Sequence, residues 1–213
     1  MLSLSLTGVR SLVAVGAHPD DIEIAAGGLL LSLASASPGI RVHYVLCTGT
    51  AERQAEARAA AAAFLPGADL SFALHQLPDG RLPAHWNAVK EILHDAGGDF
   101  TPDLVICPAL NDAHQDHRLL AEQTPTAFRD QLVLHYEIPK WDGDLARRNV
   151  YVPLPDDVAR RKVELLHEHF PSQKARDWWD EEVFLGLARL RGMECRSRYA
   201  EAFECMKAAV RIG

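Results

Sequence analysis

Five short apolar runs alternate with helix-like stretches through the first two thirds of the chain. The expected strands are Leu12–Ala17, Val42–Cys47, Leu70–Leu74, Leu104–Cys107 and Leu132–Tyr136, and the expected helices between them are Ala25–Ser35, Glu52–Phe64, Ala84–Ala96 and His114–Gln123. Runs that are apolar throughout are typical of parallel strands buried on both faces and joined by right-handed helical crossovers. The alternation therefore predicts an α/β fold with a Rossmann-like, doubly wound, mostly parallel sheet.

The pattern changes after Tyr136. Residues 137–155 carry four prolines or glycines around a short strand candidate, Val150–Val152, and this composition is typical of a long loop. A helical C-terminal tail is expected as Asp156–His169, Ala175–Leu190 and Tyr199–Ala209. Thr124-Pro125 is a helix restart signal that predicts a break after the fourth helix. With 213 residues, we expect one domain over 1–213, consisting of a core (1–136) and a loop and helical elaboration (137–213).

Composition excludes several classes of protein. Apolar residues make up 48% of the chain and charged residues 24%, enough apolar side chains for a real core. The net charge of −7 argues against nucleic acid as the main partner. The first residues lack the basic and long apolar segments of a secretory signal, and no apolar run is long enough to span a membrane, so a cytoplasmic protein is expected. The four scattered cysteines, Cys47, Cys107, Cys195 and Cys205, are expected to be reduced thiols.

Two polar clusters follow strands that are expected to be neighbours. His18-Pro19-Asp20-Asp21 comes directly after the first strand, and Asn111–Arg118 follows the fourth. In the common strand order 3-2-1-4-5, the first and fourth strands border the switch point where ligands bind. Topology alone therefore predicts that the two clusters face each other.

The side chains in these clusters are the ligand types of an open catalytic metal site. His18 and Asp21 lie three residues apart, as do His114 and His117, so each pair can share a face. Open zinc sites use three protein ligands and leave one position for water. One such pair is more often structural than functional, but two clusters at adjacent strand ends favour a divalent metal.

The same residues carry a resemblance to a known family. Ala17-His18-Pro19-Asp20-Asp21, with Glu23 and glycines beyond it, and His114-Gln115-Asp116-His117-Arg118 resemble motifs of the PIG-L/LmbE family of zinc-dependent N-acetylglucosamine-type deacetylases. The resemblance extends to Thr48-Gly49-Thr50, to Leu77-Pro78-Asp79-Gly80 and to Tyr199–Phe203 near the end of the chain.

The resemblance implies roles for individual residues. Zn²⁺, or another divalent metal, would be held by His18, Asp21 and His117, and Asp20 would be the general base. His114 would face the substrate carbonyl and Asp116 would orient its imidazole. Some relatives have a tyrosine two positions before the first histidine of the second motif, where this chain has Asp112. This difference leaves the partner of the carbonyl oxygen open, and His135-Tyr136 is one substitute.

Other residues have both a functional and a structural interpretation. Arg53 can grip a sugar hydroxyl or phosphate, or pair with Glu52 or Glu56, and Asp79 can accept sugar hydroxyls or simply belong to a turn. Tyr136 and the segment up to Trp141 can stack on a sugar or pack a loop. Glu23 can support a metal ligand or interact with the helix dipole. Four arginines near the C-terminus are expected on a solvated helix face or, less often, at a diphosphate: Arg189, Arg191, Arg196 and Arg198.

The function expected from the residues and the resemblance together is hydrolytic release of acetate from an N-acetylated sugar or sugar-like amine, free or as part of a conjugate. Hydrolysis of another amide or an ester is the first alternative, because the motifs specify the attacking water better than the substrate. A non-catalytic sugar- or nucleotide-binding module is the second, although the first strand–helix turn lacks the Gly-x-Gly-x-x-Gly pattern. The sequence leaves the oligomeric state open, and a homo-oligomer is compatible with it.

Overall fold

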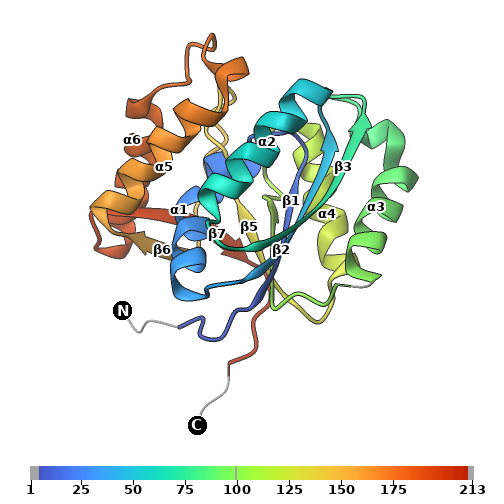
Figure 1. The fold of residues 1–213 in the computed structure, drawn as a ribbon, viewed down its shortest axis with the longest axis horizontal. Coiled ribbons are helices and arrows are strands. Elements are labelled where there is room, and N and C mark those ends of the chain that lie inside the picture. The colour runs from blue at the N-terminus through green and yellow to red at the C-terminus, as the bar shows by residue number, and fades with distance from the viewer. Residues whose placement is uncertain (1–4, 99, 211–213) are drawn as a thin grey trace.

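A seven-stranded sheet forms the centre of the molecule in the computed structural model, which describes residues 5–98 and 100–210 (Figure 1). The strand order is β3-β2-β1-β4-β5-β7-β6. The strands are β1 (Ser11–Gly16), β2 (Arg41–Thr48), β3 (Asp69–Leu77), β4 (Leu104–Pro108), β5 (Leu132–Tyr136), β6 (Val150–Leu154) and β7 (Tyr199–Cys205). The first five strands pair in parallel, and β7 runs antiparallel to both β5 and β6. The predicted doubly wound, mostly parallel sheet is confirmed.

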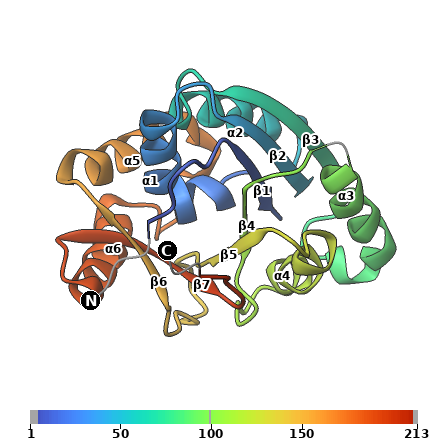
Figure 2. The ribbon, with the colours of Figure 1, turned by 90° about the horizontal axis from the view of Figure 1, so that it is seen from below.

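Helices cover both faces of this sheet. The α-helices are α1 (Asp21–Ala36), α2 (Ala51–Phe64), α3 (Trp86–Gly98), α4 (Gln115–Ala127), α5 (Asp156–His169) and α6 (Glu181–Cys195), with short 3₁₀ turns η1 (Leu82–His85) and η2 (Pro171–Gln173). In Figure 2, α1, α2 and α5 lie on the opposite side of the strands from α3 and α4. None of the described helices is long and apolar enough to cross a membrane.

The central strands are buried on both faces because their alternate side chains enter two different cores. In β1, Leu12 and Ala14 belong to the core beneath α1, α2 and α5, whereas Val13 and Val15 belong to the core beneath α3 and α4. Both faces of a parallel strand must be apolar for this packing. The uniformly apolar runs in the sequence have this origin.

The C-terminal tail differs from the expected three helices. The segment from Tyr199, predicted as a helix, is instead strand β7, and Phe203 on it is fully buried in the larger core. Its alanines and glutamates favour a helix in isolation, but pairing with β5 and β6 overrides that weak preference.

The predicted break at Thr124-Pro125 is also wrong. Helix α4 continues through Pro125 to Ala127. The hydroxyl of Thr124 donates to the carbonyl of Leu120 (2.7 Å) instead of capping a new helix.

Helix α1 is kinked, and a carboxylate from β7 caps the kink. Ala26 has non-helical dihedral angles (φ −130°, ψ 15°), which frees backbone N–H groups inside the helix. The amides of Gly28 and Leu29 donate to the two carboxylate oxygens of Glu201, each at 2.7 Å. A Cβ on Gly28 would lie 2.5 Å from the side chain of Leu154 and 3.1 Å from Glu201 Oε1, so glycine lets both side chains approach the kink closely. The Glu201 of the resembling Tyr199–Phe203 segment is therefore a structural residue.

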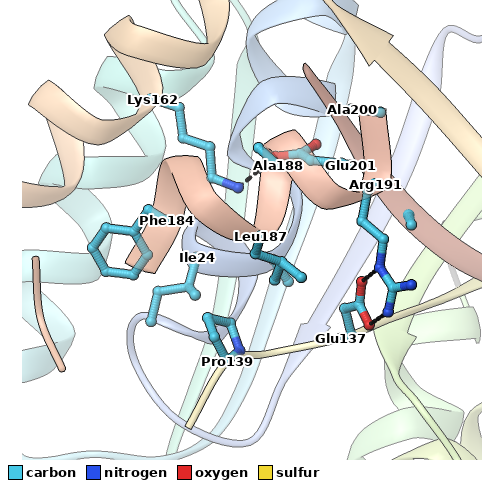
Figure 3. Close-up of a pocket in the computed structure, with 12 residues that line it drawn as sticks. Ile24, Glu137, Pro139, Lys162, Phe184, Leu187, Ala188, Arg191, Ala200 and Glu201 are labelled. Carbon is cyan, nitrogen blue, oxygen red and sulfur yellow. Dashed lines mark hydrogen bonds and ion pairs between the residues drawn. The ribbon is translucent and has the colours of Figure 1, made fainter. Parts of the chain in front are cut away.

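Two buried ion pairs hold the C-terminal elements to the sheet (Figure 3). Lys162 of α5 pairs with Glu201 (2.7 Å), and Arg191 of α6 forms a two-pronged pair with Glu137, at 2.7 and 2.6 Å. Arg191 was expected on a solvated helix face or at a diphosphate, but it is 7% exposed and is neutralised by Glu137, at the start of the β5–β6 loop. The interaction fixes that loop to α6.

Candidate metal centre

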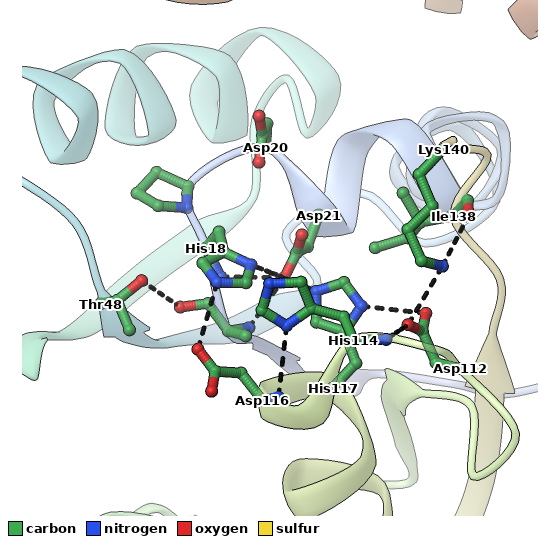
Figure 4. A network of polar contacts seen from close by, with 12 residues as sticks. His18, Asp20, Asp21, Thr48, Asp112, His114, Asp116, His117, Ile138 and Lys140 are labelled. Atoms are coloured by element: carbon green, nitrogen blue, oxygen red, sulfur yellow. Dashed lines mark hydrogen bonds and ion pairs between the residues drawn. The ribbon is translucent and has the colours of Figure 1, made fainter. Parts of the chain in front are cut away.

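Two loops meet at the carboxyl ends of the central strands (Figure 4). Strand β1 pairs directly with β4, so the residues that follow each strand lie side by side. The loop after β1 carries His18 and leads into α1 at Asp21, and the loop after β4 leads into α4, whose first turn carries His117. The predicted juxtaposition of the two clusters is present.

Three ligand atoms converge between these loops. His18 Nδ1 lies 3.1 Å from His117 Nε2, and Asp21 Oδ2 lies 3.2 Å from His117 Nε2 and 3.5 Å from His18 Nδ1. A tetrahedral zinc ion with bonds of about 2.0–2.1 Å places its ligand atoms roughly 3.3–3.4 Å apart. The triangle therefore fits a small divalent cation at its centre.

The backbone fixes the carboxylate of this triangle. Oδ2 of Asp21 accepts hydrogen bonds from the amides of Ala17 (2.9 Å) and His18 (2.8 Å). The loop after β2 packs closely against the turn after β1. Gly49 in that loop has φ +120°, and a Cβ there would lie 2.5 Å from Pro19, so the position requires glycine. The Thr48-Gly49-Thr50 segment of the sequence thus supports the turn that presents His18 and Asp21.

The electrostatics of the triangle favour positive charge. Burial alone would lower the pKa of His18, but Asp21, Asp116 and Asp79 raise it to about 12. Burial likewise lowers the pKa of His117, but Asp21 and Asp112 raise it to about 9. Burial raises the pKa of Asp21, yet the two imidazoles bring it well below its ordinary value. The protonated imidazoles balance the negative charge of the nearby carboxylates, and a cation can replace these protons.

Each histidine ligand has a carboxylate behind it. His117 Nδ1 lies 2.9 Å from Asp112 Oδ2, and Asp112 Oδ1 in turn contacts Lys140 Nζ at 3.0 Å. The second nitrogen of a metal-bound histidine commonly donates to such a carboxylate. The sequence reasoning treated Asp112 only as a replaced tyrosine and missed this role. The sequence could have indicated this role of Asp112, because histidine ligands of metals commonly pair with a carboxylate.

The structure places Asp116 differently from its expected role. Its carboxylate accepts the amides of Gly80 (2.8 Å) and Leu82 (3.0 Å), and Oδ2 lies 3.4 Å from His18 Nε2. It therefore stands behind His18 and does not hydrogen-bond to the imidazole of His114, which it was expected to orient. Asp79 lies beside it, 3.0 Å from the same nitrogen, and 63% of its side chain is exposed.

His114 lies at the mouth of the centre, half-buried. Its ring centroid is 4.7 Å from that of His18 and 4.8 Å from that of His117. Nδ1 accepts the amide of Asp116 (3.2 Å), which caps α4 and places the proton of the neutral ring on Nε2. Burial and the charges of the other two histidines lower its pKa, although Asp116 opposes them. These opposing effects together favour the neutral ring.

Asp20 immediately precedes Asp21 in the chain, but its carboxylate pairs with Arg53 and is not one of the three converging groups. Its backbone has φ 147°, a value unusual for a residue other than glycine, at the N-cap of α1. Its Oδ2 contacts Arg53 Nη2 at 2.9 Å, and Arg53 also donates to the Pro19 carbonyl (3.0 Å). Burial raises the pKa of Asp20 to about 7, against the lowering effect of Arg53. A carboxylate with this pKa can exchange protons near neutral pH.

Three residues with open roles make their hydrogen bonds outside the triangle. Tyr136, expected to contact the substrate, is fully buried and donates to the carbonyl of Val15 (2.7 Å), so it packs the core and has no exposed surface for a substrate. His135 is buried, with Nδ1 2.9 Å from the Pro108 carbonyl. Glu23 accepts the hydroxyl of Tyr44 (3.1 Å), and burial raises its pKa to about 8.

Comparisons with known proteins relate the chain to one family and several structures. A sequence model of the family described as PIG-L, GlcNAc-PI de-N-acetylase, matches residues 13–128. N,N'-diacetylchitobiose deacetylase from Pyrococcus horikoshii is 21% identical, with 93% of this chain and 84% of that chain covered and a TM-score of 0.68. The 4-carboxy-2-hydroxymuconate hydratase GalB from Pseudomonas putida is 19% identical, with 96% of this chain and 99% of that chain covered and a TM-score of 0.75. A conserved protein from Thermus thermophilus is 20% identical, with 96% of this chain and 97% of that chain covered and a TM-score of 0.73. A search of curated protein sequences finds no significant match.

Proposed function

The chain belongs to the PIG-L family of GlcNAc-PI de-N-acetylases, and from this premise we propose that it is a metal-dependent hydrolase that releases acetate from an N-acetylated sugar or sugar-like amine. The observation that carries the proposal is the triangle of His18 Nδ1, Asp21 Oδ2 and His117 Nε2, with sides of 3.1–3.5 Å. His114 packs against both histidine rings of the triangle, and its neutral ring can donate from Nε2. Asp20 precedes Asp21 in the chain and can exchange a proton near neutral pH.

The three atoms of the triangle would hold the metal. Zinc suits two imidazole nitrogens and one carboxylate oxygen, and other divalent metals accept the same set. When bound, such a cation supplies Lewis acidity, which polarises a carbonyl group and lowers the pKa of water to about 7.

The remaining groups would move protons and stabilise charge. Asp20 takes a proton from the attacking water as the bond between water oxygen and amide carbon forms. His114 donates a hydrogen bond from Nε2 to the carbonyl oxygen, where negative charge develops. Cleavage of the C–N bond then releases acetate, and Asp20 returns its proton to the departing amine.

Arg53 and Asp79 are proposed to contact the sugar. Arg53 holds Asp20, and Nη2 is shared between that carboxylate and a backbone carbonyl. The exposed carboxylate of Asp79 lies beside His18, where it can accept sugar hydroxyls. Two contacts support the proposal: Arg53 pairs with Asp20, and Asp79 lies 3.0 Å from His18 Nε2.

The experiment that tests the proposal combines metal analysis with product analysis. We expect the purified protein to contain or bind one divalent metal per chain, and to release acetate from N-acetylglucosamine derivatives in a metal-dependent way. Chelator treatment and metal restoration provide the control. The hydratase among the similar structures shows that this fold hosts other reactions of water. Hydration of an alkene acid without acetate release from any acetamide would therefore contradict the proposal, as would a protein that binds no metal.

A further inference from the structure

The backbone next to His114 is held by the β5–β6 loop, residues 137–149. This loop lies beyond the family match of residues 13–128. Oδ2 of Asp144 accepts the backbone amide of Ala113 (2.6 Å), and the carbonyl of Asp144 accepts the side-chain amide of Asn111 (3.4 Å). Ala113 directly precedes His114 in the chain. The β5–β6 loop therefore holds the segment that presents a group assigned to the reaction.

A second carboxylate holds the next amide along the chain. Oδ1 of Asp112 accepts the amide of His114 (2.7 Å), so the amides of Ala113 and His114 are held by two different aspartates. Nζ of Lys140 lies 3.0 Å from Asp112 Oδ1 and 2.6 Å from Asp144 Oδ2, and it joins the two carboxylates. Figure 4 shows Lys140 reaching Asp112 from the β5–β6 loop. We call Asp112, Lys140 and Asp144 the His114 anchor.

The His114 anchor is shielded from solvent. The side chains of Asp112, Lys140 and Asp144 are 3%, 10% and 13% exposed. Charges in such a place are screened less by water and salt than charges on an open surface. Removing one of them leaves its partner shielded and unpaired, so the cost is greater than for an exposed pair. The anchor is therefore a firm attachment between the loop after β4 and the β5–β6 loop.

This attachment limits how His114 can move. Its own amide and that of Ala113 are bound by the anchor, and Nδ1 of its ring accepts the amide of Asp116 (3.2 Å). A group that stabilises developing charge must be held in place before the reaction starts. A displacement of about 1 Å can cost about 100-fold in rate. Contacts that fix the backbone of His114 thus bear on the rate of the chemical step.

We propose that Asp144 is a positioning residue for the reaction. It holds the amide of Ala113 and, through Lys140, the carboxylate of Asp112, and in this way it keeps the ring of His114 at the mouth of the metal centre. The inference rests on the proposed deacetylation and gives the β5–β6 loop a part in it. The described contacts of Asp144 are with Asn111, Ala113 and Lys140 and not with the metal-binding triangle. Its removal should therefore affect turnover and not metal binding.

The kinetic test uses the metal-loaded full-length protein with N-acetylglucosamine. Asp144→Ala should lower kcat for acetate release about 3- to 10-fold, with KM and the affinity for Zn²⁺ close to those of the wild type. Asp144→Asn should restore part of kcat, because its amide oxygen can still accept from Ala113. In a His114→Ala background, Asp144→Ala should cause no further fall, because the two changes remove the same contribution.

Asp103 provides the matched control. Its carboxylate also accepts two backbone amides, those of Arg10 (2.8 Å) and Ser11 (3.0 Å), but it lies at the amino end of β4, opposite the metal centre. Asp103→Ala should therefore lower the free energy of unfolding without changing kcat. Full kcat in Asp144→Ala would overturn the positioning role. An equal loss in the presence and absence of the His114 side chain would overturn it too, since Asp144 would then not act through His114.

Amide hydrogen exchange, followed by NMR, tests the anchor without reference to acetate release. The amides of Ala113 and His114 should exchange faster in Asp144→Ala than in the wild type, and should keep their wild-type rates in Asp103→Ala. A wild-type protein that releases no acetate refutes the proposed function. In that case faster exchange in Asp144→Ala still supports the anchor, whereas unchanged exchange refutes the anchor as well.

Discussion

Asp112 Oδ2 lies 2.9 Å from Nδ1 of His117, on the opposite side of the imidazole from the nitrogen that faces His18 and Asp21. The carboxylate holds the proton on Nδ1, so the proton that a cation would displace is the one on Nε2, which faces the triangle. Lys140 occupies the other oxygen of Asp112, so the carboxylate cannot turn away without breaking an ion pair. The chain thus determines that Nε2 of His117, and not Nδ1, is the nitrogen available to a cation.

Removal of this carboxylate should weaken metal binding. We expect Asp112→Ala to reduce the affinity of the metal-free protein for Zn²⁺ about 10- to 100-fold, and Asp112→Asn to have a smaller effect because the amide oxygen can still accept from Nδ1. Competition with a chromophoric chelator measures the affinity without reference to activity. Asp144→Asn is the matched control, since Asp144 contacts Lys140 but not His117. Wild-type affinity in Asp112→Ala would show that the carboxylate does not support the ligand.

Variants of Asp20 and His117 should distinguish loss of catalysis from loss of metal binding. Asp20→Asn preserves the shape of the side chain and removes its basicity, so we expect bound metal to be retained and kcat to fall about 10²- to 10⁴-fold. His117→Ala deletes one corner of the triangle and should lose the metal. Metal content by mass spectrometry and acetate release measure both effects. Unimpaired acetate release by either variant would contradict the assigned roles.

Arg53 should set the pH at which Asp20 becomes active. Burial raises the pKa of Asp20 to about 7, and the charge of Arg53 opposes that rise. Removing Arg53 must therefore raise the pKa further, whether or not a cation is bound. Since the base works when deprotonated, the acidic limb of kcat/KM should move to higher pH in Arg53→Ala and stay close to its original position in Arg53→Lys. A limb that moves to lower pH, or does not move, would show that Asp20 is not the titrating base.

Much of the fold follows from patterns that act over short distances. The strand containing Leu12–Val15 could be predicted because each of its side chains enters one of two cores, and adjacency of β1 and β4 follows from a common topology. The same topology was sufficient to bring His18 and His117 together.

Other features depend on contacts that no local pattern encodes. Residues 199–205 are rich in alanine and glutamate, and they form a strand only because β5 and β6 pair with them. The partner of Asp116 could not be predicted because the backbone of Gly80 and Leu82 reaches it from a different strand end. Arg191 resembles a surface residue until the β5–β6 loop brings Glu137 to it.

Glu201 should be essential for stability, because three donors depend on its carboxylate. It accepts the amides of Gly28 and Leu29 at the kink of α1, and the ammonium group of Lys162 at 2.7 Å. Glu201→Ala leaves a buried charge and two buried N–H groups without partners, and we expect the free energy of unfolding to fall by about 3–5 kcal/mol. Urea denaturation measures the change.

A second variant distinguishes the charge from the hydrogen bonds at Glu201. Adding Lys162→Met to Glu201→Ala removes the unpaired ammonium group and should recover more than about 1 kcal/mol, while the amides at the kink remain unsatisfied. The exposed pair of Arg161 and Glu164 is the matched comparison, and Glu164→Ala should change the free energy of unfolding by less than about 1 kcal/mol because solvent screens that pair. A cost for Glu201→Ala as small as that of Glu164→Ala would mean that water can replace the carboxylate at the kink. Helix α1 would then owe its bent form to packing around Ala26 and not to the capping interaction from β7.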